Sequence, residues 1–303
     1  MIDFHKLEPE DGKRYEKYLR QGSHRGCSYG FTNLFLWGRQ SAAVVQDHLV
    51  LFSHFDGHTM YPFPMGEGDV KPVLDAIIAD SQKRGIPCRI TGMTEKETAI
   101  LEELYPKRFR YHCDRDSFDY VYDINDLADL KGRKFQQKRN HVNKFEASNP
   151  DWEIRPLSAE NLEECEKLTQ RWYQRRMEED PHMDLLMEQN AIRRAYLYYD
   201  QLELEGIALY VQGKMVAMTM GSLLDDETMD VHFEKADVDV QGAYAAINRA
   251  FARYVREKYP NVKYLNREDD TGNPGLRQAK LSYHPHHMVE KCWALLTLEE
   301  YDE

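Results

Sequence analysis

Apolar residues along the first 130 positions follow two kinds of spacing. Between residues 70 and 84 they recur three and four positions apart, which predicts an amphipathic helix. Two apolar runs at 42–45 and 49–52, separated by three polar residues, predict a β-hairpin. The other elements expected here are a buried helix at 28–38, a strand at 88–91, a helix at 94–105 and strands within 109–122.

The second half of the chain repeats this order of elements. Residues 206–211 and 215–223 flank a glycine-containing turn and predict a second hairpin, and residues 242–258 carry apolar side chains on one helical face. The other elements expected are helices at 159–177, 183–200 and 274–281 and strands at 229–234, 262–265 and 288–296. The repeated order, without a literal sequence repeat, predicts an α+β fold of two similarly built domains at 1–130 and 151–303.

A basic segment at 131–150 lies between the two predicted domains. Residues 131–145 hold six lysines and arginines and no acidic residue. As a helix, the segment places Phe135, Val142 and Phe145 along one side and basic residues along another. We therefore expect a bridging helix with one apolar face and one cationic face.

The charge of this segment contrasts with that of the whole chain, whose net charge is −12. Residues 1–150 hold 22 basic and 22 acidic residues, so the excess of acid lies in the second half. Because an acidic protein is a poor general binder of nucleic acids and anionic membranes, such contacts require a local basic patch. The basic helix is either this patch or a solvated helix whose lysines pair with the acidic half. Its candidate phosphate contacts are Arg133, Lys134, Lys138 and Arg139, and Asn143 is a further candidate for substrate binding.

The sequence does not favour a secreted or membrane-spanning protein. No stretch approaches the about 18 to 20 apolar residues that cross a bilayer, and the N-terminus lacks a basic stretch followed by an apolar core. The five cysteines are scattered and form no CxxC pair, so we expect reduced thiols in a cytoplasmic protein. These cysteines are Cys27, Cys88, Cys113, Cys165 and Cys292.

Several segments together resemble one protein family. They are GRKFQQKRNHVNKF at 132–145, VHFEKAD at 231–237, GAY at 242–244, NRED at 266–269 and KLSYHP at 280–285. Over nearly its whole length the chain is similar to the C-terminal domain family of phosphatidylglycerol lysyltransferases. The resemblance implies two tandem acyltransferase domains of the GNAT type, related to the Fem peptidyltransferases. Those relatives move an aminoacyl group from a charged tRNA onto an amine or hydroxyl.

Two charged residues are candidates for catalysis. Glu234 ends an otherwise apolar strand, where its carboxylate could take a proton from an amine nucleophile or simply face water. Lys280 shares the core side of a short helix with Leu276, and a partly buried ammonium can stabilise an oxyanion. The resemblance to the related transferases implies this role for Lys280, and the alternative is a structural ion pair with Glu234 or Glu268. His232, close to Glu234 on the same strand, is expected to be a packed strand residue.

Charged residues also follow the strand expected at 262–265. Loops at the carboxyl ends of central strands often hold ligands in open α/β sheets. Arg267 could grip a carboxylate or phosphate with two hydrogen bonds, while Glu268 or Asp269 could receive an ammonium group. The other interpretation is a plain turn, since residues 269–275 are rich in turn-forming types.

The turn before the helix at 242–258 occupies the place where GNAT enzymes bind coenzyme A. In such a turn, backbone N–H groups at a helix N-terminus cradle the pyrophosphate. Gly242 and Ala243 are the candidate cofactor contacts, but the turn holds a single glycine. Asp237 and Asp239 would either repel a pyrophosphate or cap the helix. Coenzyme A is therefore possible but disfavoured.

Signatures of other enzyme classes are missing from the sequence. It contains no GxSxG, HExxH, GxxxxGK[ST] or GxGxxG, and the histidines at 284–287 lack the spacing and partners of a metal site. We expect an aminoacyltransferase that uses aminoacyl-tRNA or another phosphate-bearing donor. Its acceptor would be an amine or hydroxyl of a small molecule, peptide or lipid head group. The alternatives are an acyl-CoA-dependent N-acyltransferase and a non-catalytic module that binds an anionic ligand.

Overall fold

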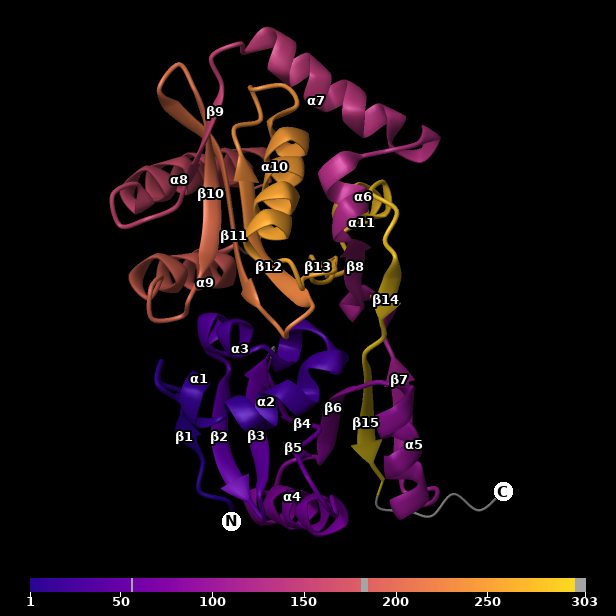
Figure 1. The fold of residues 1–303 in the computed structure, drawn as a ribbon. Coiled ribbons are helices and arrows are strands. Elements are labelled where there is room, and N and C mark those ends of the chain that lie inside the picture. The colour runs from indigo at the N-terminus through magenta and orange to yellow at the C-terminus, as the bar shows by residue number, and fades with distance from the viewer. Residues whose placement is uncertain (56, 181–184, 298–303) are drawn as a thin grey trace. The chain divides into compact units, whose positions relative to one another are not determined.

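Two mixed β-sheets organise the chain, and each lies mainly in its own unit (Figure 1). The computed structural model describes residues 1–55, 57–180 and 185–297. Unit 1 contains Met1–Asp119, Asp269–Pro274 and the chain from Met288 onward. Unit 2 contains Tyr120–Glu268 and Gly275–His287. The expected α+β fold is confirmed.

In unit 1 the strand order is β1-β2-β3-β4-β6-β15-β7, and β5 pairs with β3. Neighbouring strands are antiparallel except β4 and β6, which are parallel. The strands are β1 (His5–Lys6), β2 (Gln40–Val45), β3 (His48–Phe55), β4 (His58–Pro62), β5 (Met65–Gly66), β6 (Arg89–Met93), β7 (Phe109–Cys113) and β15 (Cys292–Leu296). The helices are α1 (Asp11–Arg14), α2 (Glu16–Gly22), α3 (Phe31–Trp37), α4 (Lys71–Arg84) and α5 (Glu95–Leu104).

The core of unit 1 follows from the apolar spacing in its sequence. Val73, Leu74 and Ile77 of α4 are fully buried in one cluster with Tyr61 of β4 and Ile90 of β6. They recur at the helical period that predicted this element, and the helix ends at a glycine in the left-handed conformation. The amphipathic helix expected at 70–84 is therefore confirmed.

In unit 2 the strand order is β14-β8-β13-β12-β11-β10-β9, and β12 and β13 are parallel. Helix α10 packs on one face of this sheet and α8 on the other. Glu234 contacts α10 and the next residue, Lys235, contacts α8, and successive side chains of a strand point to opposite faces of the sheet. The strands are β8 (Asp119–Asp123), β9 (Glu153–Pro156), β10 (Glu205–Val211), β11 (Lys214–Leu223), β12 (Thr228–Ala236), β13 (Tyr264–Asn266) and β14 (His287–Val289). The helices are α6 (Ile124–Asp129), α7 (Gln136–Ser148), α8 (Leu162–Glu179), α9 (Leu186–Leu197), α10 (Ala243–Lys258) and α11 (Pro274–Leu281).

The two sheets have the same strand order once their strands are matched by position. Each has an edge strand, a hairpin, a parallel pair and two further strands: β1, β2-β3, β4-β6, β15 and β7 in one, and β9, β10-β11, β12-β13, β8 and β14 in the other. Strands β8 and β15 occupy matching positions, but each lies in the sheet formed mainly by the other half of the chain. Strand β8 comes from the first half and lies in the sheet of unit 2, whereas β15 comes from the end of the chain and lies in the sheet of unit 1. The repeated order of elements is confirmed.

Because of this exchange of strands, each unit is built from segments that are not continuous in the sequence. The units do not follow the expected boundaries of 1–130, 131–150 and 151–303, and the basic segment belongs to unit 2. The expected strand at 288–296 is two strands, β14 and β15, which lie in different sheets. Sheet hydrogen bonds join residues that are distant in the sequence, so local patterns could not show this division.

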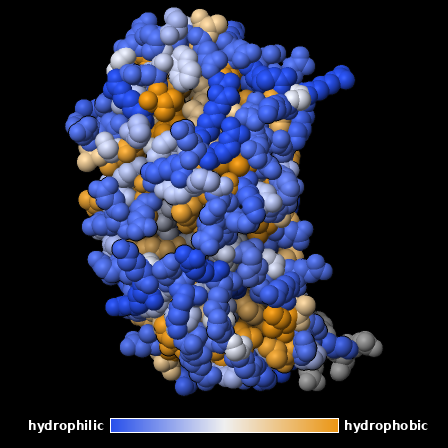
Figure 2. Space-filling model, viewed as in Figure 1, coloured by the Kyte–Doolittle hydropathy of each residue, from blue (hydrophilic) through white to orange (hydrophobic). Residues whose placement is uncertain are grey.

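Among the residues that the structure describes, no helix has the length and apolar content needed to cross a membrane. The face of the molecule drawn in Figure 2 is mostly hydrophilic and is interrupted by smaller hydrophobic areas. Scattered apolar side chains of this kind are normal on folded proteins.

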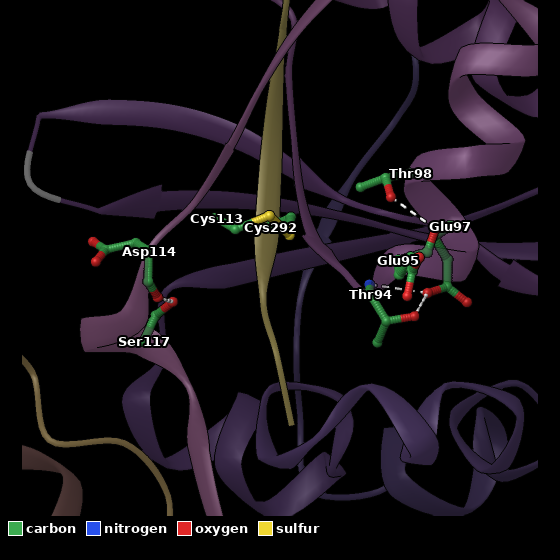
Figure 3. The surroundings of a disulfide bond; sticks show 8 residues. All are labelled: Thr94, Glu95, Glu97, Thr98, Cys113, Asp114, Ser117 and Cys292. Atoms are coloured by element: carbon green, nitrogen blue, oxygen red, sulfur yellow. Dashed lines mark hydrogen bonds between the residues drawn. A yellow bond between two sulfur atoms is a disulfide. The ribbon is translucent and has the colours of Figure 1, made fainter. Parts of the chain in front are cut away.

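Cys113 and Cys292 form a disulfide that joins β7 and β15 (Figure 3). The two residues are directly opposite in the antiparallel register, with 4.1 Å between their Cα atoms and a sequence separation of 179. The expectation of five reduced thiols was wrong for this pair, because pairing between distant strands leaves no local sequence pattern. The other three cysteines are buried and not disulfide-bonded. The cytoplasmic location, which rested partly on reduced thiols, stays a prediction.

Glu97 is expected to make the stability of unit 1 depend on pH. Burial by itself would raise the pKa of Glu97, but hydrogen bonds with His24 and Thr94 outweigh it and lower the pKa to about 2. The carboxylate accepts hydrogen bonds from the Thr94 backbone N–H at 3.0 Å and from the Thr94 hydroxyl at 2.5 Å (Figure 3). A depressed pKa stabilises the fold above the ordinary value of 4.5, and this stability is lost as the pH falls towards about 2.

The measurement is urea unfolding of the native protein and Glu97→Gln at neutral pH and at decreasing acidic pH. We expect the variant to be less stable by about 3 kcal/mol at neutral pH. The difference should shrink as the native carboxylate is protonated. A difference that stays constant over the whole range would contradict this role of Glu97.

Candidate functional site

The candidate site begins where two parallel strands of unit 2 stop pairing. Strands β12 and β13 pair only as far as Asp230 and Asn266, although β12 continues to Ala236. Beyond the last pair, Arg267 Nη2 donates a hydrogen bond to Glu234 Oε1 at 2.9 Å. The two side chains are largely buried, with 14% and 10% of their surfaces exposed. The parallel pair therefore holds a buried ion pair at the end of its ladder.

A second cation, Lys138 of the basic helix α7, lies beside this ion pair. Its Nζ atom is 4.0 Å from the ring centroid of Tyr283, and the Arg267 guanidinium carbon is 5.2 Å from the same centroid. Burial lowers the pKa of Lys138 and the charge of Arg267 lowers it further, while Glu234 acts in the opposite direction. Among the described residues, Lys138 has no ion-pair partner. The site therefore has two cations for one carboxylate.

Three buried polar atoms of this region have no hydrogen-bond partner within the described part of the chain. They are Arg267 Nη1, Asn248 Oδ1 and Thr219 Oγ1. Asn248 Nδ2 donates to Glu234 Oε2 at 3.3 Å, and Thr219 is directly opposite Glu234 in the ladder of β11 and β12. Because buried polar groups in proteins are nearly always paired, a ligand could use this spare hydrogen-bonding capacity.

Lys280 fixes the backbone at Arg267. Its ammonium donates to the Arg267 carbonyl oxygen at 2.5 Å, and its own carbonyl oxygen accepts a hydrogen bond from the Tyr122 hydroxyl at 2.8 Å. An ion pair of Lys280 with Glu234 or Glu268 was the alternative from the sequence. In the structure Glu234 pairs with Arg267 and not with Lys280, and Glu268 lies beside His232.

The two acidic residues that follow β13, Glu268 and Asp269, belong to different units. Glu268 ends a segment of unit 2, and its Oε1 is 3.2 Å from His232 Nδ1. The other ring nitrogen of His232 is 2.9 Å from the Ser222 hydroxyl, so His232 is a packed strand residue as expected. Asp269 belongs to unit 1, where its charge acts on the pKa of Lys291. Glu268 and Asp269 therefore lie in different units, and each by itself stays a candidate for binding an ammonium group.

Most of the basic segment is occupied with contacts of its own. Lys134 forms an ion pair with Asp126 at 2.7 Å, and Arg139 donates to the carbonyl oxygens of Leu130 and Gly132. Arg133 and Asn143 are exposed. Of the five residues of this segment that were predicted to bind substrate, Lys138 is therefore the one that the structure brings to the ion pair of Glu234 and Arg267.

The apolar face of the basic segment packs against α10. Phe135, Val142 and Phe145 are fully buried, as expected from their spacing, although α7 itself begins at Gln136 after a short 3-10 turn. Phe135 and Val142 share a core cluster with Ala245 of α10. This packing holds α7 against α10 and so fixes the position of Lys138 on α7.

Helix α7 also covers the start of α10. Gly242 caps α10 with a φ of 85°, and a Cβ added there would lie 2.5 Å from the His141 carbonyl oxygen and 3.0 Å from Phe145 Cβ. Ala243, the first residue of the helix, is buried. Asp239 in the preceding turn forms an ion pair with Arg175 at 2.9 Å. The backbone of α7 therefore lies close to the N-terminus of α10, which is the helix end where a GNAT enzyme would bind a pyrophosphate.

Replacing Gly242 with alanine should destabilise unit 2 more than the same change at Gly132. Both glycines have a left-handed φ, 85° and 83°, which costs about 1 kcal/mol or more for a residue with a Cβ. At Gly132 nothing lies within 4 Å of an added Cβ, whereas at Gly242 the methyl group meets backbone. Urea unfolding of the two variants measures the additional cost of this contact. Equal loss of stability would contradict the close approach of α7.

Asn248 was missed as a functional candidate. It lies within the buried face of α10, between the apolar residues Ile247 and Phe251. A polar side chain inside an apolar stripe is itself an indication of a buried hydrogen bond.

Comparison with known proteins shows the family and the fold of this chain. The sequence model of a family described as Phosphatidylglycerol lysyltransferase, C-terminal, matches residues 19–295. A conserved protein of unknown function from Bacteroides thetaiotaomicron is 38% identical, with a TM-score of 0.92, over 98% of this chain and 100% of that one. L-PGS from Bacillus licheniformis is 14% identical, with a TM-score of 0.68, over 97% of this chain and 94% of that one.

FemX has the same fold at 12% identity, with a TM-score of 0.59 and 98% of each chain covered. The expected fold of two tandem GNAT-like domains is confirmed. An uncharacterised protein of Mycoplasmoides gallisepticum is 24% identical over 176 residues, which are 58% of this chain and 55% of that protein. The match therefore spans about half the length of this curated relative.

Proposed function

The chain belongs to the phosphatidylglycerol lysyltransferase C-terminal family, and on that premise we propose that it transfers an aminoacyl group from aminoacyl-tRNA. The observation that carries this proposal is the cluster of Glu234, Arg267 and Lys138, in which two cations share one carboxylate. An aminoacyl-tRNA brings phosphates, an ester and an ammonium group together. The cluster offers complementary groups for each of them.

Arg267 and Lys138 are proposed to stabilise negative charge during transfer. The acceptor amine or hydroxyl attacks the ester carbonyl carbon, and the carbonyl oxygen becomes an oxyanion. The unpartnered Arg267 Nη1 and the Lys138 ammonium are donors for this oxygen, in a largely buried site where such donors are more effective than in water. Lys280 acts as a positioning residue, because it holds the Arg267 carbonyl.

Glu234 is proposed to move the proton. The attacking group must lose a proton, and the ribose oxygen of the tRNA must gain one when the ester bond breaks. Hydrogen bonds from Arg267 and Asn248 orient the Glu234 carboxylate. It can accept the proton from the attacking group and return it to the leaving oxygen. The transfer is then direct and needs no covalent enzyme intermediate.

Acyl-CoA is not the donor in this proposal. The contact of α7 with Gly242 and the carboxylates of the preceding turn both oppose a pyrophosphate at the start of α10. The acceptor class stays broad: an amine or hydroxyl of a small molecule, a peptide or a lipid head group. A cytoplasmic location follows from tRNA as the donor.

The test supplies the purified protein with bulk bacterial tRNA charged with radiolabelled amino acids. Free amines, a short peptide and phosphatidylglycerol vesicles serve as acceptors. We expect transfer of the label, and a loss of about 100-fold or more in kcat/KM for Arg267→Gln. Lys138→Met should also lose activity, and it breaks no ion pair with a described residue, so unfolding does not explain its loss. Lys144→Met, which changes an exposed residue of the same helix, is the matched control.

The outcomes separate the proposal from its alternatives. Absence of transfer with all charged tRNAs and acceptors contradicts it, and so does full activity of Arg267→Gln and Lys138→Met. A rise in Tm with micromolar acetyl-CoA would indicate an acyl-CoA-dependent enzyme instead. Saturable binding of an anionic ligand without turnover would indicate a non-catalytic module.

A further inference from the structure

Two side-chain contacts join the turn after β13 to strand β12 in unit 2. Backbone pairing of the two strands stops at Asn266. Beyond it, Arg267 donates a hydrogen bond to Glu234 at 2.9 Å, and Glu268 Oε1 is 3.2 Å from His232 Nδ1. His232 and Glu234 are two residues apart on β12, so their side chains lie on the same face of the strand. Two consecutive residues of the turn therefore both contact one face of β12.

A left-handed backbone at Glu268 allows this arrangement. In an extended chain, consecutive side chains point to opposite sides. Glu268 has a φ of 56°, which is unfavourable for a residue with a Cβ. Its N–H donates to the side-chain oxygen of Asn266 at 2.8 Å, and its carbonyl oxygen accepts the Tyr120 N–H at 3.0 Å. Such a conformation persists only where the surrounding contacts hold it.

The imidazole of His232 is one of these contacts, and its own orientation is fixed from both sides. Nε2 is 2.9 Å from the Ser222 hydroxyl, and 2% of the side chain is exposed. Because an ionised carboxylate can only accept a hydrogen bond, Nδ1 carries a proton and donates to Glu268. The Asp230 carboxylate is 3.7 Å from Nδ1, which is too far for a hydrogen bond. His232 therefore ties Glu268 to β12.

Arg267 is held on either side of its own side chain. Its N–H donates to the Tyr120 carbonyl oxygen at 2.9 Å, and its carbonyl oxygen accepts the Lys280 ammonium at 2.5 Å. The next residue, Glu268, is tied to His232. The direction of the Arg267 side chain therefore depends on the conformation of the turn as well as on its ion pair with Glu234.

We propose that His232 is a positioning residue, which holds the turn through Glu268 so that Arg267 faces the ester carbonyl during transfer. His232 exchanges no proton with the substrate in this role. A displacement of about 1 Å at a catalytic group can lower a rate about 100-fold, so a contact two residues away has a measurable effect. The inference rests on the proposed function for the step that Arg267 assists. The link from His232 to Arg267 rests on the contacts alone.

The test compares His232→Asn and His232→Gln in the transfer assay with charged tRNA. The asparagine amide nitrogen is bonded to Cγ, as Nδ1 is, so it can still donate to Glu268. The glutamine amide lies one atom further out, towards Ser222, and cannot replace Nδ1. We expect His232→Gln to lower kcat about tenfold to a hundredfold with KM changed by less than about twofold. His232→Asn should retain most of the native kcat.

A matched control and a second measurement separate positioning from general damage. His48→Gln changes a buried histidine of unit 1 and should retain the native kcat. Urea unfolding of His232→Gln, Arg267→Gln and the double variant needs no activity. The two changes should not be additive, because the turn couples the two side chains. Thermal unfolding checks that each variant is folded.

The possible results distinguish this inference from the proposed function. Non-additive unfolding in a protein that transfers no aminoacyl group supports the link from His232 to Arg267 and contradicts the proposed function. Transfer that depends on Arg267 but is equal in His232→Gln and the native protein overturns the inference alone. Equal loss of kcat in His232→Asn and His232→Gln, or additive unfolding, also overturns it. So does a rise in KM at native kcat, because Glu268 would then bind substrate directly.

Discussion

Reduction of the Cys113–Cys292 disulfide is expected to lower the free energy of unfolding of unit 1 by about 5 kcal/mol. The bond joins residues with a sequence separation of 179, so it closes a loop that contains the main segment of unit 2. Without the bond, β15 must find its place between β6 and β7 after a long intervening chain. A cross-link over so long a loop removes much of the conformational freedom of the unfolded chain.

Differential scanning calorimetry with and without a phosphine reductant measures this effect. Cys113→Ser should unfold at the temperature of the reduced native protein and should not respond to the reductant. Cys88→Ser, which changes a buried cysteine outside the bond, should keep the response. Alkylation of both Cys113 and Cys292 in unfolded, unreduced protein would show that the bond does not form in solution.

Asp119→Asn is expected to destabilise unit 1 by about 3–5 kcal/mol. The Asp119 side chain is fully buried, and it accepts hydrogen bonds from the Lys291 ammonium at 2.5 Å and from the Cys27 backbone N–H at 2.7 Å. Burial alone would lower the pKa of Lys291, but the neighbouring Asp119 carboxylate raises it well above its usual value. Asparagine keeps the shape of the side chain but leaves a buried ammonium without its counter-ion.

A double-mutant cycle separates the ion pair from general damage to the core. Lys291→Met added to Asp119→Asn removes both charges, so it should recover part of the lost stability. The measurement is the free energy of unfolding of the native protein, both single variants and the double variant. Strict additivity of the two single changes would show that the charges are not coupled.

The elements of the fold follow largely from local sequence patterns. The spacing of apolar residues in α4, with glycine after its last residue, places that helix almost to the residue. The first hairpin, β2 and β3, extends by at most three residues beyond either end of the expected runs. These patterns depend on a few neighbouring residues, because a helix and a hairpin are closed by hydrogen bonds within a short segment.

The candidate site was predictable in its charged members but not in their pairing. Glu234, Arg267 and Lys138 were identified from a strand end, a loop and a basic helix, and the structure brings these three together. Asn248 was missed, and the hydrogen bond from Lys280 to the Arg267 carbonyl oxygen was not predicted. Which charge meets which partner depends on side-chain directions that residue types alone do not show.

By itself, the amino-acid sequence determined most of the longer helices and strands, their order, and the presence of two similar halves. It also determined the family, because its characteristic segments are continuous stretches of residues. The tertiary structure decided the exchange of β8 and β15, the disulfide, and the Asp119–Lys291 ion pair. Each of these joins positions that are far apart along the chain. Such contacts form only when the complete sheets are assembled, so no local pattern encodes them.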